Sequence, residues 1–316
     1  MLGILKLIRI RTLLFAAFTM YCMRYFVIRS ILDINGLTLQ LPDWAFTLSV
    51  LSVCALIAGA NVINDYFDTR TDRLSAVKDV VVGRCITRRT AMTLHSVLNV
   101  LAIVIAFGLS IYVGIWKIGI LFLLVSGLLW FYSSAYKRYL LIGNLIVGIL
   151  AALIPLCVLL FEIPLLNDEY SDLLIQTDTK FMYLFNWILG FSLFIFLNTV
   201  IYEMNKDIYT IPGDIEKGIR SVPVRWGIRA TRIVISVWTA IAVCCAVVLY
   251  FTVFSESSLV LTYIALGICL PYCIYLVCVW FSVKRSLQLG IIRLIMVLCV
   301  AFSFLLHHFF DLIFSN

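Results

Sequence analysis

The segment AFTLSVLSVCALIAGANVIN, residues 45–64, contains no charged side chain. A helix of about 20 residues spans the hydrocarbon core of a bilayer, so this segment predicts a membrane-spanning α-helix. Strand-like alternation of apolar and polar residues is absent along the chain. Because only helices and closed barrels satisfy their backbone hydrogen bonds in lipid, the segment indicates an all-α integral membrane protein.

Eight further apolar stretches of similar length occur in the 316-residue chain. They run near residues 12–31, 91–112, 116–135, 140–161, 181–203, 231–254, 258–282 and 290–313. The composition agrees, since 63% of the residues are hydrophobic and only 13% are charged. A soluble domain is nearer half apolar and a quarter charged, so a soluble enzyme, a disordered chain and a nucleic-acid binder are excluded. We expect residues 1–316 to form a single membrane domain with about nine spanning helices.

The loops between these stretches alternate in charge. One side holds 20 of the 24 Lys and Arg residues and eight acids, for a net charge of +12. The other side holds four bases and nine acids, among them Glu162, for a net charge of −5. The positive-inside rule places the basic side in the cytoplasm. With nine spans, the N-terminus is then cytoplasmic and the C-terminus lies on the opposite side.

The first cluster of acids on the basic side is NVINDYFDTRTD, residues 61–72, at the end of the second span. On a continuous helix its polar side chains fall within an arc of roughly 100°; they are Asn61, Asn64, Asp65, Asp68 and Asp72. Carboxylates stacked on one face repel one another, and more so near lipid, so we expect a cation there. Oxygen ligands without Cys or His favour Mg²⁺ or Ca²⁺ over zinc.

The second cluster follows the sixth span and contains Glu203, Asp207, Thr210 and Asp214. Pro212-Gly213 predicts a break in the helix, which leaves the register of Asp214 open. Mg²⁺ commonly binds through one or two carboxylates and substrate phosphates, so two such faces would hold a diphosphate between them. Neighbouring bases would complete the anion site. The alternative is a pair of solvated loops with internal ion pairs.

Three features resemble the UbiA-type intramembrane prenyltransferases: the nine spans, NDYFDTRTD at 64–72, and KDIYTIPGDIEKGIRSVPVRWG at 206–227. The first family motif, Asn-x-x-x-Asp-x-x-x-Asp, maps onto Asn64, Asp68 and Asp72. A Tyr and a Lys after the fourth span map onto Tyr132 and Lys137, within FYSSAYKRYLLIGN. That stretch is most similar to the geranylgeranylglyceryl-phosphate geranylgeranyltransferase branch of the family.

The resemblance implies nine helices around a central cavity, capped by the two acidic cytoplasmic loops. It also implies Mg²⁺-dependent transfer of a prenyl group from a polyprenyl diphosphate to a hydrophobic, lipid-soluble acceptor. Geranylgeranylglyceryl phosphate is the favoured acceptor, and an aromatic quinone precursor or a tetrapyrrole stays open. The implied metal ligands are Asn64, Asp65, Asp68, Asp72, Asp207 and Asp214. The implied diphosphate ligands are Lys137, Arg138, Lys206, Arg70 and Lys78. The implied catalytic residues are Asp68, Asp72, Lys137 and Tyr132.

Two departures from the family pattern leave other functions open. Thr210 stands where the second motif usually has an aspartate, which makes Asp207 the expected substitute ligand. The order of Lys78 and Asp79 inverts the usual acid–base pair, whereas Lys206, Asp214 and Lys217 match the family in type. The alternatives are an inactive family member serving as a scaffold and, from another class, a membrane transporter, since acids within membrane helices mark ion pathways.

Overall fold

The computed structural model describes residues 2–75, 80–177 and 180–313, and it gives no account of the side chains of 2, 70–75, 138, 177 and 310–313. In the described residues, nine helical segments are long and apolar enough to span a membrane. They are Ile10–Ile34, Asp43–Thr69, Arg88–Tyr112, Lys117–Ser134, Ile142–Glu169, Met182–Asp207, Val222–Val253, Ser258–Trp280 and Arg285–Phe309. The all-helical fold with nine spans is therefore confirmed.

Most spans are single helices: α4 (Asp43–Ser75), α5 (Arg88–Tyr112), α6 (Lys117–Ser134), α7 (Ile142–Glu169), α9 (Met182–Asp207), α11 (Val222–Val253) and α14 (Arg285–Ile313). The first span joins α2 (Ile10–Cys22), the π-helix η1 (Met23–Ile28) and α3 (Arg29–Ile34). The eighth joins α12 (Ser258–Thr262), the π-helix η3 (Tyr263–Cys269) and α13 (Leu270–Trp280). The short elements are α1 (Leu2–Leu7), η2 (Tyr136–Arg138), α8 (Ser171–Thr177) and α10 (Ile211–Lys217).

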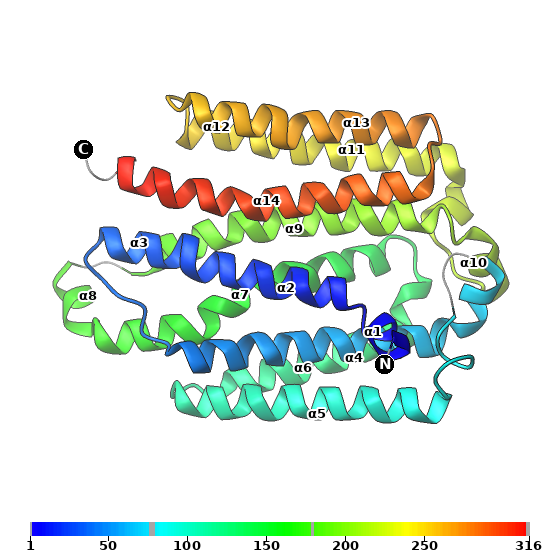
Figure 1. The fold of residues 1–316 in the computed structure, drawn as a ribbon, viewed down its shortest axis with the longest axis horizontal. Coiled ribbons are helices and arrows are strands. Elements are labelled where there is room, and N and C mark those ends of the chain that lie inside the picture. The colour runs from blue at the N-terminus through cyan, green and yellow to red at the C-terminus, as the bar shows by residue number, and fades with distance from the viewer. Residues whose placement is uncertain (1, 76–79, 178–179, 314–316) are drawn as a thin grey trace.

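The long helices lie roughly along one axis, with α10 at one end of the molecule and α8 at the other (Figure 1). Helix α1 lies on the side of α10, and the C-terminus lies near the end that holds α8 (Figure 1). Two termini at opposite ends are what an odd number of spans requires.

The helix is interrupted within the second acidic segment, as predicted, but Pro212 lies after the interruption and not in it. Helix α9 ends at Asp207, and α10 begins at Ile211 with Pro212 in its first turn. Proline is favoured in a first helical turn because its missing N–H would have no helical partner there. Gly218 ends α10 in the left-handed conformation (φ 68°), which a side chain would disfavour. This short helix packs against α4 and so brings the two acidic segments together.

A buried ion pair ties the opposite end of the bundle. Arg24 Nη1 of η1 lies 2.7 Å from Glu162 Oε2 of α7, and both side chains are almost fully buried. Glu162 Oε1 also accepts hydrogen bonds from the backbone N–H groups of Gln40 (2.6 Å) and Leu41 (3.1 Å). The assignment of Glu162 to the loop after the fifth apolar stretch was wrong, because its helix continues to Glu169. A buried charge is tolerated when it is paired and hydrogen-bonded, and Arg24 supplies the pair.

Candidate active site

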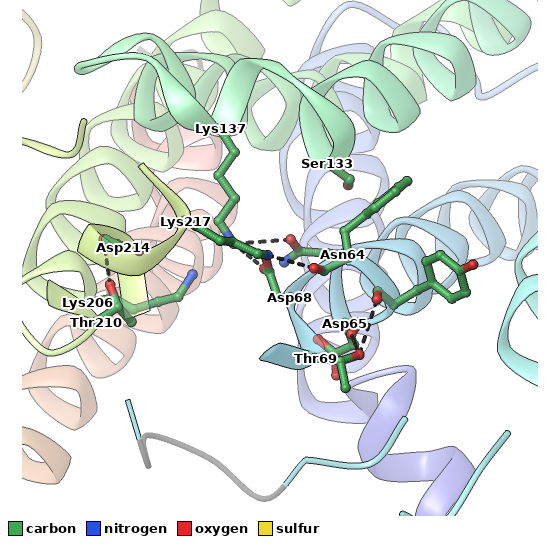
Figure 2. Close-up of polar contacts among 12 residues, drawn as sticks. Asn64, Asp65, Asp68, Thr69, Ser133, Lys137, Lys206, Thr210, Asp214 and Lys217 are labelled. Carbon is green, nitrogen blue, oxygen red and sulfur yellow. Dashed lines mark hydrogen bonds and ion pairs between the residues drawn. The ribbon is translucent and has the colours of Figure 1, made fainter. Parts of the chain in front are cut away.

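Asp68 is the centre of the acidic site at the end with α10. Its side chain is almost fully buried near the C-terminal end of α4. Lys137 Nζ donates to Asp68 Oδ2 and, at 3.3 Å, to Oδ1 of Asn64, one turn earlier on α4. Lys217 Nζ donates to Asp68 Oδ1 at 3.1 Å. Figure 2 shows the two lysine side chains meeting at this carboxylate from separate elements. The Asp68 carboxylate therefore accepts hydrogen bonds from two ammonium groups.

Lys217 anchors α10 to α4, since its Nζ also donates to the carbonyl oxygen of Phe67 at 2.6 Å. Sequence reasoning noted Lys217 only as a match in type and did not include it in the site. The missed signal was its spacing, because Lys217 follows Asp214 by three residues and so lies one helical turn beyond it. A lysine at that position of a seven-residue helix reaches the neighbouring acidic segment.

The first cluster divides between two surroundings, although helical spacing places its members in one arc. Asp65 Oδ1 accepts from Arg9 Nη2 at 2.9 Å, and Asn61 Nδ2 donates to the carbonyl oxygen of Ile8 at 3.0 Å. Both partners belong to the segment between α1 and α2. Asp65 thus holds that segment on α4, while Asn64 and Asp68 face the lysines (Figure 2). A metal-ligand role for Asp65 stays a prediction.

The acids of the second cluster each have a polar partner. Lys206 Nζ lies 2.5 Å from Glu203 Oε2, and Asn144 Nδ2 donates to Asp207 Oδ2 at 2.9 Å. The hydroxyls of Thr210 (3.1 Å) and Ser221 (3.0 Å) donate to Asp214 Oδ2. Burial raises the pKa of the Asp214 carboxyl, and these hydrogen bonds and the charge of Lys137 act against that shift. Thr210 stands where the family motif has an aspartate, and its hydroxyl helps to orient the Asp214 carboxylate.

Tyr132 belongs to the same site. Its phenol, on α6, lies within electrostatic range of Lys137, Glu203, Lys206 and Asp207. Lys206 in turn interacts electrostatically with Lys137. The structure thus brings together the predicted residues Asn64, Asp68, Tyr132, Lys137, Lys206, Asp207 and Asp214. The predicted residues Arg70, Asp72, Lys78 and Arg138 lie outside the described side chains.

The donor set fits a hard divalent cation bound together with an anion. Asn64, Asp68, Asp207 and Asp214 offer amide and carboxylate oxygens, which suit Mg²⁺. In the part of the chain that the structure describes, no three acidic, His or Cys side chains lie close enough to hold a metal ion by themselves. Instead, the ammonium groups of two lysines donate to the Asp68 oxygens. Ammonium groups in such a position also suit the oxygens of a phosphate.

A pocket of about 70 Å³ opens on this arrangement. Its lining includes Asp68, both lysines, Phe67 of α4 and Ser133 of α6. A second, more open hollow of about 650 Å³ has mostly apolar walls from α12, η3, α13 and α14, and it contains none of the charged site residues. Of these two hollows, the small one therefore contains the charged contacts around Asp68.

Comparison with known proteins agrees with this architecture. Residues 36–286 match the model of the UbiA prenyltransferase family. The chain is 26% identical to the digeranylgeranylglyceryl phosphate synthase of Methanobrevibacter smithii over 71% of this chain and 73% of that protein. It is 29% identical to the synthase of the same name from Methanosphaera stadtmanae, over 68% and 71%.

Solved structures show the same fold. A UbiA homologue from Aeropyrum pernix superposes with a TM-score of 0.63 at 18% identity, over 90% of this chain and 97% of that one. A UbiA homologue from Archaeoglobus fulgidus, bound to DMAPP and Mg²⁺, gives 0.59 at 17% identity, over 97% and 99%. The family match covers more than three quarters of the sequence, and its acidic segments are those that meet at Asp68. The chain belongs to the UbiA prenyltransferase family.

Proposed function

We propose that this protein transfers a prenyl group from a polyprenyl diphosphate to a lipid-soluble acceptor, with Mg²⁺ as cofactor. The observation that carries the proposal is the position of Asp68 between Lys137 and Lys217, beside Asn64. Paired ammonium groups next to oxygen ligands form a site for a diphosphate and its metal. The A. fulgidus homologue bound to DMAPP and Mg²⁺ supports this interpretation.

In the proposed reaction, the bond between C1 of the prenyl group and the diphosphate oxygen breaks. Lys137 and Lys217 would move from Asp68 to the phosphate oxygens and stabilise the charge that develops on the leaving group. Asn64, Asp68 and the predicted ligand Asp72 would hold one metal ion, and Asp207 with Asp214 would supply oxygens from the other side. Mg²⁺, when bound, neutralises diphosphate charge as a Lewis acid.

The allylic fragment carries positive charge in the transition state and must be kept from water. Apolar helix walls provide such surroundings, and the Tyr132 ring can stabilise the cation through its π face. The acceptor oxygen then forms the new bond to C1, and its proton passes to the released diphosphate.

We infer that the acceptor is a glycerol-phosphate ether lipid of the geranylgeranylglyceryl phosphate type. The names of the relatives and the similarity of FYSSAYKRYLLIGN to that branch support this choice. The site end would face the cytoplasm, since the basic loops lie there. Residues 1–316 would act as a single domain.

The test is product identification. Purified protein in liposomes is incubated with labelled geranylgeranyl diphosphate, Mg²⁺ and a panel of acceptors, and the products are identified by mass spectrometry. Transfer to geranylgeranylglyceryl phosphate is expected. Transfer to an aromatic or tetrapyrrole acceptor alone would correct the acceptor class. Ion or solute flux without any transfer would support a transporter and overturn the proposal.

A further inference from the structure

The last three spans carry basic side chains at one end and almost no acids. From Gly218 to Phe310 the sequence contains seven Lys and Arg residues but one acid, Glu256. Glu256 follows the end of α11, whereas α11 begins, α13 ends and α14 begins at the end of the molecule that holds α10 (Figure 1). Five of the bases lie at that end: Arg225, Arg229, Arg232, Lys284 and Arg285. A basic surface therefore adjoins the candidate active site.

Arg232 belongs to α11, and its side chain lies within this basic surface. Its Nη2 donates to Ser282 Oγ at 2.5 Å and its Nη1 to the carbonyl oxygen of Trp280 at 3.3 Å, so it bridges α11 and the turn between α13 and α14. The Nε donor is buried without a hydrogen-bond partner among the described residues. Ser282 itself has a left-handed backbone (φ 55°), a strained conformation that is common at ligand sites. The two oxygen partners are neutral, and no ion pair to Arg232 occurs among the side chains that the structure describes.

Arg285 approaches the same place from α14. Its guanidinium carbon lies 5.2 Å from the centre of the Tyr209 ring. Burial raises the pKa of the Tyr209 phenol, and the charges of Arg285 and Arg232 both act against that shift. Arg285 thus contacts the phenol in the linker between α9 and α10, and the positive charge of Arg232 acts on the same phenol. An anion bound between the two guanidinium groups would be attracted by both.

Exposed aromatic side chains mark the depth of this surface in the membrane. Trp226, Trp280 and Phe281 are 49%, 42% and 78% exposed. Tryptophan and other aromatic side chains gather at the level of lipid headgroups. The basic surface is therefore placed where the phosphate groups of membrane lipids lie.

We propose that the phosphate of an anionic glycerophospholipid binds between Arg232 and Arg285, with its acyl chains beside Trp280. Guanidinium groups bind phosphate oxygens through paired hydrogen bonds, and clusters of bases next to spanning helices attract anionic lipids. Arg229 and Lys284 add charge from exposed positions. The bound lipid would brace Tyr209 and hence the linker that leads to α10. This inference does not depend on the proposed transferase activity.

The experiment compares lipids that differ only in headgroup charge. The full chain, purified in detergent, is titrated with phosphatidylglycerol or phosphatidylcholine, and the bound lipids are counted by native mass spectrometry. We expect one phosphatidylglycerol to bind in preference to phosphatidylcholine, and added salt to weaken that preference. Equal retention of both lipids would overturn the proposal, as would displacement by inorganic phosphate at a concentration similar to that of the lipid.

Charge-neutral variants locate the site. Arg229→Gln and Lys284→Gln leave the Arg232 contacts intact, and each should weaken phosphatidylglycerol binding about fivefold. Arg232→Gln should weaken it further. The control is Arg29→Gln with Lys117→Gln, exposed bases at the opposite end, which should change nothing. Binding should survive in Asp68→Asn. Loss in Asp68→Asn, or an equal loss in the control, would overturn the assignment.

Discussion

The Nζ atom of Lys217 lies 3.1 Å from Oδ1 of Asp68, although 149 residues of chain separate them. The lysine of the second acidic segment thus neutralises the central aspartate of the first. Helix α10 is docked on α4 through this contact and through the Lys217 bond to the Phe67 carbonyl. A diphosphate with its metal would have to replace the ion pair, so ligand binding and the docking of α10 are coupled.

Asp68→Asn should reduce prenyl transfer at least hundredfold, because the amide lacks the negative charge of the carboxylate and so binds the cation opposite the diphosphate much more weakly. The measurement is initial rate at saturating geranylgeranyl diphosphate and Mg²⁺. Asp33→Asn is the matched control, since Asp33 is a half-exposed acid paired with Arg29 at the opposite end. Transfer that persists in Asp68→Asn would show that this residue is not a metal ligand.

Thr210→Asp would restore the family's aspartate spacing four residues before Asp214. Without Mg²⁺ it should lower the free energy of unfolding by about 1 kcal/mol, because a hydrogen bond to Asp214 is lost and two like charges meet. Mg²⁺ should reverse the loss and raise Tm by more than it does for the original protein. Thermal unfolding with and without Mg²⁺ measures both effects. An equal Mg²⁺ response in the two proteins would argue against a metal ligand at Asp214.

Gly143→Ala should disturb Lys137 without unfolding the protein. A Cβ atom at Gly143 would lie 3.3 Å from Cα of Lys137, so the lysine backbone must shift by a few tenths of an ångström. Misplacement of a binding group on this scale should lower kcat/KM about tenfold. Gly127→Ala is the control, since no atom lies within 4 Å of a Cβ there. Unchanged kinetics in Gly143→Ala would mean that Lys137 tolerates this displacement.

Removing one member of the buried pair at the far end should destabilise the fold without touching the site. Arg24→Met or Glu162→Leu leaves the other buried group without its main partner and should cost about 3–5 kcal/mol. The double change Arg24→Met with Glu162→Leu should recover part of that loss, although two backbone N–H groups then lose their acceptor. Thermal unfolding of the single and double variants in detergent gives the coupling energy between positions 24 and 162. Strictly additive losses would show that the pair is not coupled.

The spans could be predicted because membrane insertion depends on length and apolar composition, which are local properties. Asp68 and Lys137 could be assigned through the family resemblance. Helical spacing alone could not show that Arg9 approaches α4 from the N-terminal segment and pairs with Asp65. Lys217 and the Arg24–Glu162 pair depend on contacts between distant parts of the chain, and no local pattern contains that information.

The pairing of Arg24 also has consequences for biogenesis. Glu162 emerges from the ribosome 138 residues after Arg24, when the second, third and fourth spans have already been made. Asp43 emerges much sooner, and its carboxylate lies 3.3 Å from Arg24 Nη2 in the finished protein. During synthesis, the first two spans can therefore keep the arginine compensated as a hairpin, and Glu162 joins them when α7 arrives. Assembly of the bundle then follows the order of translation, with Asp43 as the early partner and Glu162 as the late one.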